Sequence, residues 1–195
     1  MNQFSDEQLF KLFQEGDNKS FDKLIIKYQD KLITFIYMIV GDIDLAEDLA
    51  QETYVKVITK KNTYNETGAK FSTWMYTIAK NAAFTELRKK TRRKTDAFSD
   101  IKKEKYDRPG RPIDIADTSQ SPEKKIMTDL LRKDIQISLS KLKEDFRIII
   151  ILRDIQELSY DDISIILEVP IGTVKSRINR AREKLLELLK EKGIV

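Results

Sequence analysis

Three of the four prolines in this chain of 195 residues, Pro109, Pro112 and Pro122, fall between residues 96 and 125. Gly110 lies among them, and a polar run of Asp, Thr, Ser and Gln follows. Proline interrupts helices and sheets, because its nitrogen carries no hydrogen to donate and its ring restricts the backbone. A polar segment with several prolines is therefore typical of a linker, and it divides the chain into two parts.

Apolar residues recur at helical spacing on both sides of this segment, and neither side shows the sustained alternation of a strand. We therefore expect an all-α protein with two small helical domains, residues 1–95 and 126–195, joined by a flexible linker of residues 96–125. Hydrophobic residues make up 41% of the chain, which is enough to bury a core but not several large ones.

The chain contains neither cysteine nor histidine. Disulfide bonds, thiolate zinc sites, cysteine nucleophiles, Ser-His-Asp triads and imidazole ligands are thereby excluded. We expect a protein that is not an enzyme, with no catalytic residue, no metal site and no cofactor. The first residues lack the pattern of a signal peptide, and the apolar runs are too short to span a bilayer. We therefore expect a cytoplasmic protein without membrane insertion.

The net charge of +4 is unevenly distributed along the chain. Residues 41–60 carry five acidic and two basic side chains, whereas residues 61–95 carry nine basic and two acidic ones. This reversal suggests two surfaces for two different partners. Ordinary solvated helix faces are the alternative explanation for either segment.

A helix with an acidic face is expected from Asp42 or Asp44 onwards. Its inward side is made by residues four apart: Leu45, Leu49, Thr53 and Val57. Asp44, Asp48 and Glu52 form a second stripe beside it. Like charges at this spacing cost a helix roughly 0.2–0.5 kcal/mol per pair, whereas the helix dipole favours anions only near the N-terminus. The helix dipole explains the position of Asp44 better than that of Glu52. The other interpretation of the acidic stripe is that it binds a cationic protein partner.

A second charged helix is expected to begin at Phe71 and to end in a basic run, in which six of residues 88–94 are Lys or Arg. The helix dipole acts only over the last turn and does not account for six cations. Cations that neutralise phosphates, together with rings that stack on unpaired bases, are typical of a nucleic-acid groove. Phe71 and Trp74 are the candidate rings, although each ring taken alone fits the core better.

The last part of the chain has the spacing of a helix-turn-helix. Ser159 is expected to cap a short helix from Tyr160 to Leu167, followed by a turn with Pro170 and Gly172. A long helix is then expected over about 173–189, with Val174 and Ile178 facing inward. Residues 173–184 carry five basic side chains and a single acidic one. A recognition helix in the major groove needs such side chains in its first turns. A surface helix of a bundle is the alternative.

Four segments, in order over nearly the whole chain, resemble an extracytoplasmic-function (ECF, group IV) sigma factor of the sigma-70 family. They are DLAEDLAQETYVKV from Asp44, FSTWMYTIAKNA from Phe71, LSYDDI from Leu158 and VPIGTVKSRINRAREKL from Val169. The resemblance implies a bacterial transcription-initiation factor with a sigma-2 helical bundle and a sigma-4 helix-turn-helix. It also implies binding to core RNA polymerase, through the beta-prime clamp helices and the beta flap, and to promoter DNA.

The resemblance further implies roles for individual residues. The acidic helix would dock on core polymerase through Asp48, Gln51 and Glu52. The −10 element would be bound and opened by Asn62, Lys70, Phe71, Trp74, Lys80, Asn81, Arg88 and Arg92. The −35 element would be read by Thr173, Lys175, Ser176, Arg177, Asn179 and Arg180. An anti-sigma factor or another recruiting protein is a possible further partner.

The chain departs from the family pattern where the family often has glycine and this sequence has Glu157 and Glu168. A left-handed backbone at such a position costs a non-glycine residue about 1 kcal/mol. The inter-helix turns are therefore expected to differ in detail.

Two other classes of protein compete with the sigma factor. A stand-alone helix-turn-helix regulator would leave residues 1–95 without a role and would need a dimer surface. A nucleic-acid-processing enzyme would need paired carboxylates for a metal ion. Asp161 and Asp162 are adjacent and diverge on a helix, so they are better explained as anions in its first turn.

Overall fold

The computed structural model describes residues 4–97 and 133–194, and every regular element in these residues is helical. We call residues 4–97 the N-terminal unit and residues 133–194 the C-terminal unit. The N-terminal unit contains α1 (Asp6–Gln14), α2 (Asn18–Val40), α3 (Ile43–Thr59), the 3-10 turn η1 (Lys61–Thr63) and α4 (Phe71–Ala97). The C-terminal unit contains a helical segment at 133–141, α6 (Glu144–Ile150), η2 (Ile151–Ile155), α7 (Tyr160–Leu167) and α8 (Ile171–Glu191).

Local capping defines the helices of the N-terminal unit. Ser5 forms a capping box with Gln8 at the start of α1, a helix that the sequence analysis did not anticipate. Asp17 and Asp42 cap α2 and α3. Gly41 ends α2 in the left-handed conformation, as its position after the last apolar residue predicts.

The core of the N-terminal unit is rich in aromatic rings. Phe10 is fully buried and lies 4.8 Å from Phe71 and 5.1 Å from Tyr64, measured between ring centroids. Phe35 packs against Tyr76 at 4.9 Å. Because these rings come from α1, α2, α4 and the loop before α4, the apolar faces of separate helices meet in one core.

The C-terminal unit has the expected helix-turn-helix. Ser159 accepts a hydrogen bond from the backbone N–H of Asp162 and caps α7 as predicted. Pro170 precedes α8, which starts two residues before the predicted Thr173. Its inward residues Val174 and Ile178 are buried, so the register predicted for this helix is confirmed.

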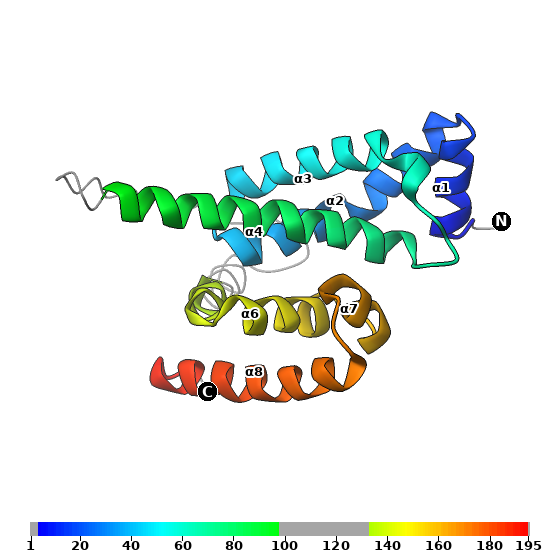
Figure 1. Cartoon of the computed structure of the whole chain (residues 1–195). Helices are drawn as coiled ribbons and strands as arrows, with labels where there is room; N and C mark the ends of the chain where they lie inside the picture. The colour runs from blue at the N-terminus through cyan, green and yellow to red at the C-terminus, as the bar shows by residue number, and fades with distance from the viewer. Residues whose placement is uncertain (1–3, 98–132, 195) are drawn as a thin grey trace, which may run out of the picture.

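The two units pack against each other along α4 (Figure 1). In this arrangement α2 and α3 lie on one side of α4, whereas α6 and α7 lie on the other, and α8 is on the far side of α6. The helix α4 therefore contributes to the core of the N-terminal unit and is also the surface on which the C-terminal unit packs. The predicted linker of residues 96–125 and the start of the predicted second domain lie almost entirely outside the described residues, so these boundaries stay a prediction.

A buried arginine reinforces this packing. The guanidinium of Arg147 donates to the carbonyl oxygens of Leu139, Ser140 and Leu142 and, across the interface, to that of Ile39 at 3.1 Å. Ile39 lies in the last turn of α2, where unpaired carbonyls carry partial negative charge. Burial lowers the pKa of Arg147 from its usual value, and the four acceptors compensate for lost water. The α2 terminus and the loop before α6 are thus held together.

The turns after η2 and α7 contain the only non-glycine residues with positive φ among the described residues, Glu157 and Glu168, each at 56°. These are the two residues at which the sequence analysis expected the inter-helix turns to differ in detail. The left-handed conformation places the Cβ atom close to the following carbonyl oxygen, which costs a non-glycine residue roughly 1–2 kcal/mol.

We predict that Glu168→Gly raises the free energy of unfolding of the protein by about 1 kcal/mol, because glycine has no Cβ to strain the turn. Urea unfolding followed by circular dichroism measures this change. Glu168→Ala is the matched control, since it removes the same carboxylate and keeps the Cβ. A Glu168→Gly variant no more stable than Glu168→Ala would contradict the assignment of strain.

Candidate nucleic-acid interface

The acidic residues of α3 lie on one solvent-facing side of this helix. Asp48, Gln51 and Glu52 are all exposed, whereas the stripe predicted to face inward is buried at Leu49, Thr53 and Val57 and half-buried at Leu45. Glu52 pairs with Lys56 at 2.7 Å within the helix. Such an exposed pair stabilises the fold little, so these carboxylates remain accessible to a partner.

Two exposed apolar residues extend this surface, and the sequence analysis did not single them out. Val55 is 58% exposed and Ile58 is also exposed. Val55 follows Asp48, Gln51 and Glu52 by seven, four and three residues, so it lies on the same side of α3. Ile58 follows Gln51 by seven residues and Val55 by three, so it extends this side toward the end of the helix. The exposed surface of α3 is therefore a mixed acidic and apolar one, and apolar patches with a polar rim are typical of protein interfaces.

The two aromatic candidates on α4 serve mainly the fold. Phe71 is 1% exposed and packs among Phe10, Tyr28 and Tyr64. Trp74 is half-buried and contacts Phe10 and Tyr64. The Phe71 ring cannot stack on a base in this conformation, which favours the core alternative for this residue. Its N–H instead donates to Glu7 at 3.3 Å, so that a carboxylate lies at the N-terminus of α4.

The polar −10 candidates fall into two groups. Asn62, on η1, and Asn81 and Arg92, on α4, are exposed. The second group contacts the C-terminal unit. Lys70 Nζ lies 2.9 Å from Asp162 Oδ2, Lys80 Nζ donates to the Ile166 carbonyl at 2.7 Å, and an Arg88 nitrogen lies 3.4 Å from a Glu144 oxygen. Burial lowers the pKa of Lys80. Of the basic run, the side chains of Arg93 and Lys94 lie outside the described part.

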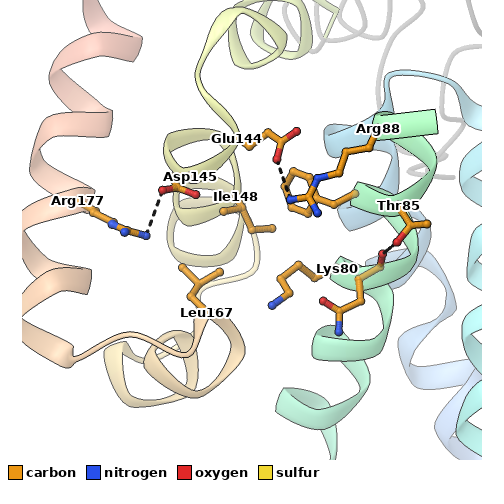
Figure 2. A pocket seen from close by; sticks show the side chains of 10 residues that line it. Lys80, Thr85, Arg88, Glu144, Asp145, Ile148, Leu167 and Arg177 are labelled. Atoms are coloured by element: carbon orange, nitrogen blue, oxygen red, sulfur yellow. Dashed lines mark hydrogen bonds and ion pairs between the residues drawn. The ribbon is translucent and has the colours of Figure 1, made fainter. Parts of the chain in front are cut away.

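A cavity of about 320 Å³ lies between the two units (Figure 2). Its walls come from α4, α6, the end of α7 and α8, and both charged and apolar side chains line it. Arg88 of α4 points toward Glu144 of α6, and Arg177 of α8 points toward Asp145 of α6, whereas Lys80 of α4 extends toward the end of α7 (Figure 2). Because most of these charges are paired within the protein, the cavity belongs to the contact between the units.

The −35 candidates on α8 are mostly free to meet a ligand. Lys175, Ser176, Asn179 and Arg180 are exposed. Thr173 is half-buried in the first turn, and Arg177 turns back to lie 3.4 Å from Asp145 of α6. The solvent-facing side of α8 thus combines side chains of the types that can read base edges with cations of the type that can bind phosphates.

Asp162 has a role that its sequence position does not reveal. Its side chain reaches out of the first turn of α7 and accepts hydrogen bonds from Thr73 of α4 and from Lys70 just before that helix, each at 2.9 Å, and from Ser159. Burial raises the pKa of the Asp162 carboxyl, but the three hydrogen bonds outweigh burial and hold the pKa below its usual value. The neighbouring Asp161 is exposed and fits the predicted role of a first-turn anion.

Two kinds of feature, a metal-binding cluster and a membrane-spanning helix, are not found in the described residues. Over residues 4–97 and 133–194, no group of three or more acidic side chains is arranged to hold a metal ion. Among the helices of these same residues, none is long and apolar enough to cross a membrane.

Family models for sigma-70 region 2 and sigma-70 region 4 match residues 24–93 and 132–185. The RNA polymerase sigma-H factor of Pseudomonas aeruginosa is 36% identical over 185 residues, which cover 95% of this chain and 94% of that protein. The ECF sigma factor SigW of Bacillus subtilis is 33% identical (93% and 95% covered), and the sigma-E factor of Escherichia coli K12 is 34% identical (94% and 93% covered).

Two solved structures have the same fold. The sigma factor RpoE of Bartonella quintana, in complex with the anti-sigma factor NepR, has a TM-score of 0.66 and 29% identity, covering 88% of this chain and 98% of that chain. CnrH, in complex with the cytosolic domain of CnrY, has a TM-score of 0.68 at 19% identity, covering 95% and 97%. The chain therefore belongs to the extracytoplasmic-function sigma factors of the sigma-70 family, non-enzymatic proteins that direct transcription initiation by RNA polymerase.

Proposed function

We propose that the exposed surface of α3 docks on core RNA polymerase through Asp48, Gln51 and Glu52. The observation that carries this proposal is the exposure of these three side chains together with Val55 on one side of a single helix. A cationic partner such as the beta-prime clamp helices would relieve the repulsion between the carboxylates, and Val55 would add apolar contact. Docking places the protein in the cytoplasm, where the polymerase works.

The two promoter elements are assigned to the two units. In the N-terminal unit, the backbone and bases of the −10 element would be held by Asn62, Lys70, Lys80, Asn81, Arg88 and Arg92. Phe71 and Trp74 would support α4 from the core. In the C-terminal unit, the −35 element would be read by Thr173, Lys175, Ser176, Arg177, Asn179 and Arg180. The same unit would contact the beta flap. The exposed polar side of α8 supports this assignment.

Control by an anti-sigma factor is a further part of the proposal. The Bartonella quintana sigma factor with the same fold is bound to an anti-sigma factor. We propose that this chain also binds a protein of that class. Pull-down with a candidate anti-sigma factor, followed by transcription with core polymerase, tests this point directly.

The docking surface is tested by Asp48→Arg combined with Glu52→Arg. Arg is a good helix former and both positions are exposed, so the helix stays folded. Two cations then face a cationic surface, which costs several kcal/mol, and we expect capture by core polymerase to be lost. Asp22→Arg with Asp30→Arg, at exposed positions of α2, makes the same charge change as a control. A docking variant that still co-purifies with core and drives transcription would disprove the assigned surface.

The apolar part of the same surface has its own test. We expect Val55→Asp to weaken capture by core polymerase about tenfold or more, because a carboxylate replaces apolar contact at the interface. Ile26→Asp is the matched control, since Ile26 is also an exposed apolar residue, at 72%, but lies on α2. Surface plasmon resonance with immobilised core measures both. Equal losses for the two variants would remove Val55 from the interface.

The −35 assignment is tested by Arg180→Ala and Lys175→Ala. A side chain that contacts a base through two hydrogen bonds contributes about 1–3 kcal/mol to discrimination, whereas a phosphate contact weakens all sequences alike. Transcription from a panel of −35 variants separates the two cases. Lys190→Ala, near the end of α8, is the control, and we expect it to leave transcription from every promoter of the panel unchanged. No loss for either test variant would remove that residue from the reading surface.

A further inference from the structure

The loop that joins α3 to α4, residues 60–70, carries two of the proposed −10 ligands, Asn62 and Lys70. We call it the pre-α4 loop. Tyr64 is its buried side chain, two others are half-buried and the rest are exposed. A loop with so little buried surface of its own depends on a few contacts for its shape. These contacts therefore decide where Asn62 and Lys70 are held.

Hydrogen bonds within the pre-α4 loop fix its second half. The Tyr64 hydroxyl donates to the carbonyl of Ala69 at 3.0 Å. The side-chain oxygen of Asn65 accepts from the backbone N–H of Thr67 at 3.0 Å and from its hydroxyl at 2.8 Å, which makes a tight turn. These bonds fix the residues of the loop relative to one another, but not relative to the helices around them.

Helix α1 runs beside this loop and binds its backbone (Figure 1). The side-chain nitrogen of Gln14 donates to the carbonyl of Lys61 at 2.6 Å and to that of Tyr64 at 3.5 Å. In the opposite direction, Lys61 Nζ donates to the carbonyl of Phe13 at 3.5 Å and lies 4.8 Å from the centre of the Phe13 ring. The amide of Gln14 thus uses both of its hydrogens on the backbone of one loop.

Two further contacts of α1 lie in the middle and at the end of the pre-α4 loop. The Phe10 ring packs on the ring of Tyr64 at 5.1 Å. Glu7 accepts from the backbone N–H of Phe71 at 3.3 Å, at the N-terminus of α4. A carboxylate at this end satisfies an N–H that has no partner within α4, and it is favoured by the helix dipole.

These polar contacts are additional to the packing of α1 in the core. The apolar side of α1 is buried through Leu9, Phe10 and Phe13. Glu7 and Gln14 are half-buried at its edges, and they reach backbone groups 64 and 47 residues away in the chain. The region 2 family model begins at residue 24, after α1, so the match assigns this helix no role.

We infer that α1 is a positioning element for promoter recognition, in which Gln14 and Glu7 hold the pre-α4 loop and the start of α4 in the shape that binds the −10 strand. Both residues act through the loop and not on the DNA itself. The inference rests on the proposed role of Asn62 and Lys70 in −10 binding. A loop that is already held in its bound shape loses less conformational freedom on binding, so its affinity for the strand is higher.

Fluorescence of Trp74 tests whether α1 holds the loop. Trp74 is the single tryptophan of the chain, and its ring lies 5.3 Å from that of Tyr64. Gln14→Met keeps the length of the side chain and removes the donor. We expect acrylamide to quench Trp74 more strongly in this variant, because Tyr64 is held less firmly over it. Gln29→Met, at an exposed position of α2, is the matched control and leaves the quenching unchanged.

Affinity for the −10 strand tests the positioning role. The probe is the fluorescein-labelled non-template strand of a promoter that is defined by sequencing the 5′ ends of transcripts, added to the protein bound to core polymerase. We expect Gln14→Met to bind this strand about threefold or more weakly than the parent and Gln29→Met, because a hydrogen bond that holds the loop is lost. Its preference over a strand with a mutated −10 element is expected to fall as well. Capture by core stays at the value of the parent.

A second pair of variants tests the contact at α4, and it keeps the inference falsifiable if Gln14→Met does not fold. Glu7→Gln and Glu7→Met remove the same charge, but only Glu7→Gln keeps an oxygen that can accept from the Phe71 N–H. We expect Glu7→Gln to bind the strand about threefold or more tightly than Glu7→Met. Circular dichroism establishes which variants are folded.

The results separate this inference from the proposed function. Unchanged strand affinity in Gln14→Met, or equal affinity in the two Glu7 variants, would overturn the positioning role even if the protein drives transcription with core. A loss of core capture as large as the loss of strand affinity would also overturn it, because α1 would then serve the stability of the whole unit. Failure of the parent protein to bind the strand with core would instead disprove the proposed −10 function, while the quenching of Trp74 still reports whether α1 holds the loop.

Discussion

The helix α4 must satisfy three environments at once, and the arrangement of the molecule depends on this constraint. One side carries Phe71, Met75 and Ala79 into the core of the N-terminal unit. A second side offers Thr73 and Tyr76 to the C-terminal unit. The remaining side exposes cations and Asn81 to solvent. A helix repeats every 3.6 residues, so these three sides can coexist only if each stays narrow.

The contact between the units combines apolar packing with buried polar groups. The buried apolar residues of the two units form one cluster. Beside it, Asp162 and Arg147 make hydrogen bonds across the contact. Because these charged groups are buried, each needs its partners on the other unit, so they specify how α7 and the loop before α6 sit against the N-terminal unit.

The residues of α3 illustrate how a local pattern leads to an interface. The inward stripe at Leu49, Thr53 and Val57 fixes the rotation of this helix against the core. Once the rotation is fixed, Asp48 and Glu52 can only face solvent. The repulsion between these neighbouring carboxylates costs the fold little, so the fold is stable without a cation beside them. The exposed carboxylates are therefore available to a partner.

Much of this architecture follows from short stretches of sequence. The end of α2 at Gly41, the cap at Ser159, the outward side of α3 and the inward register of α8 depend on periodicity and on residues within a turn of each other, so the sequence predicts them. Other properties were decided by the tertiary structure. The burial of Phe71 by Phe10, the return of Arg177 to Asp145 and the engagement of Lys70 by Asp162 join residues far apart in the chain. A charge or a ring at one position does not specify its distant partner, because many pairings satisfy the same pattern until packing selects one.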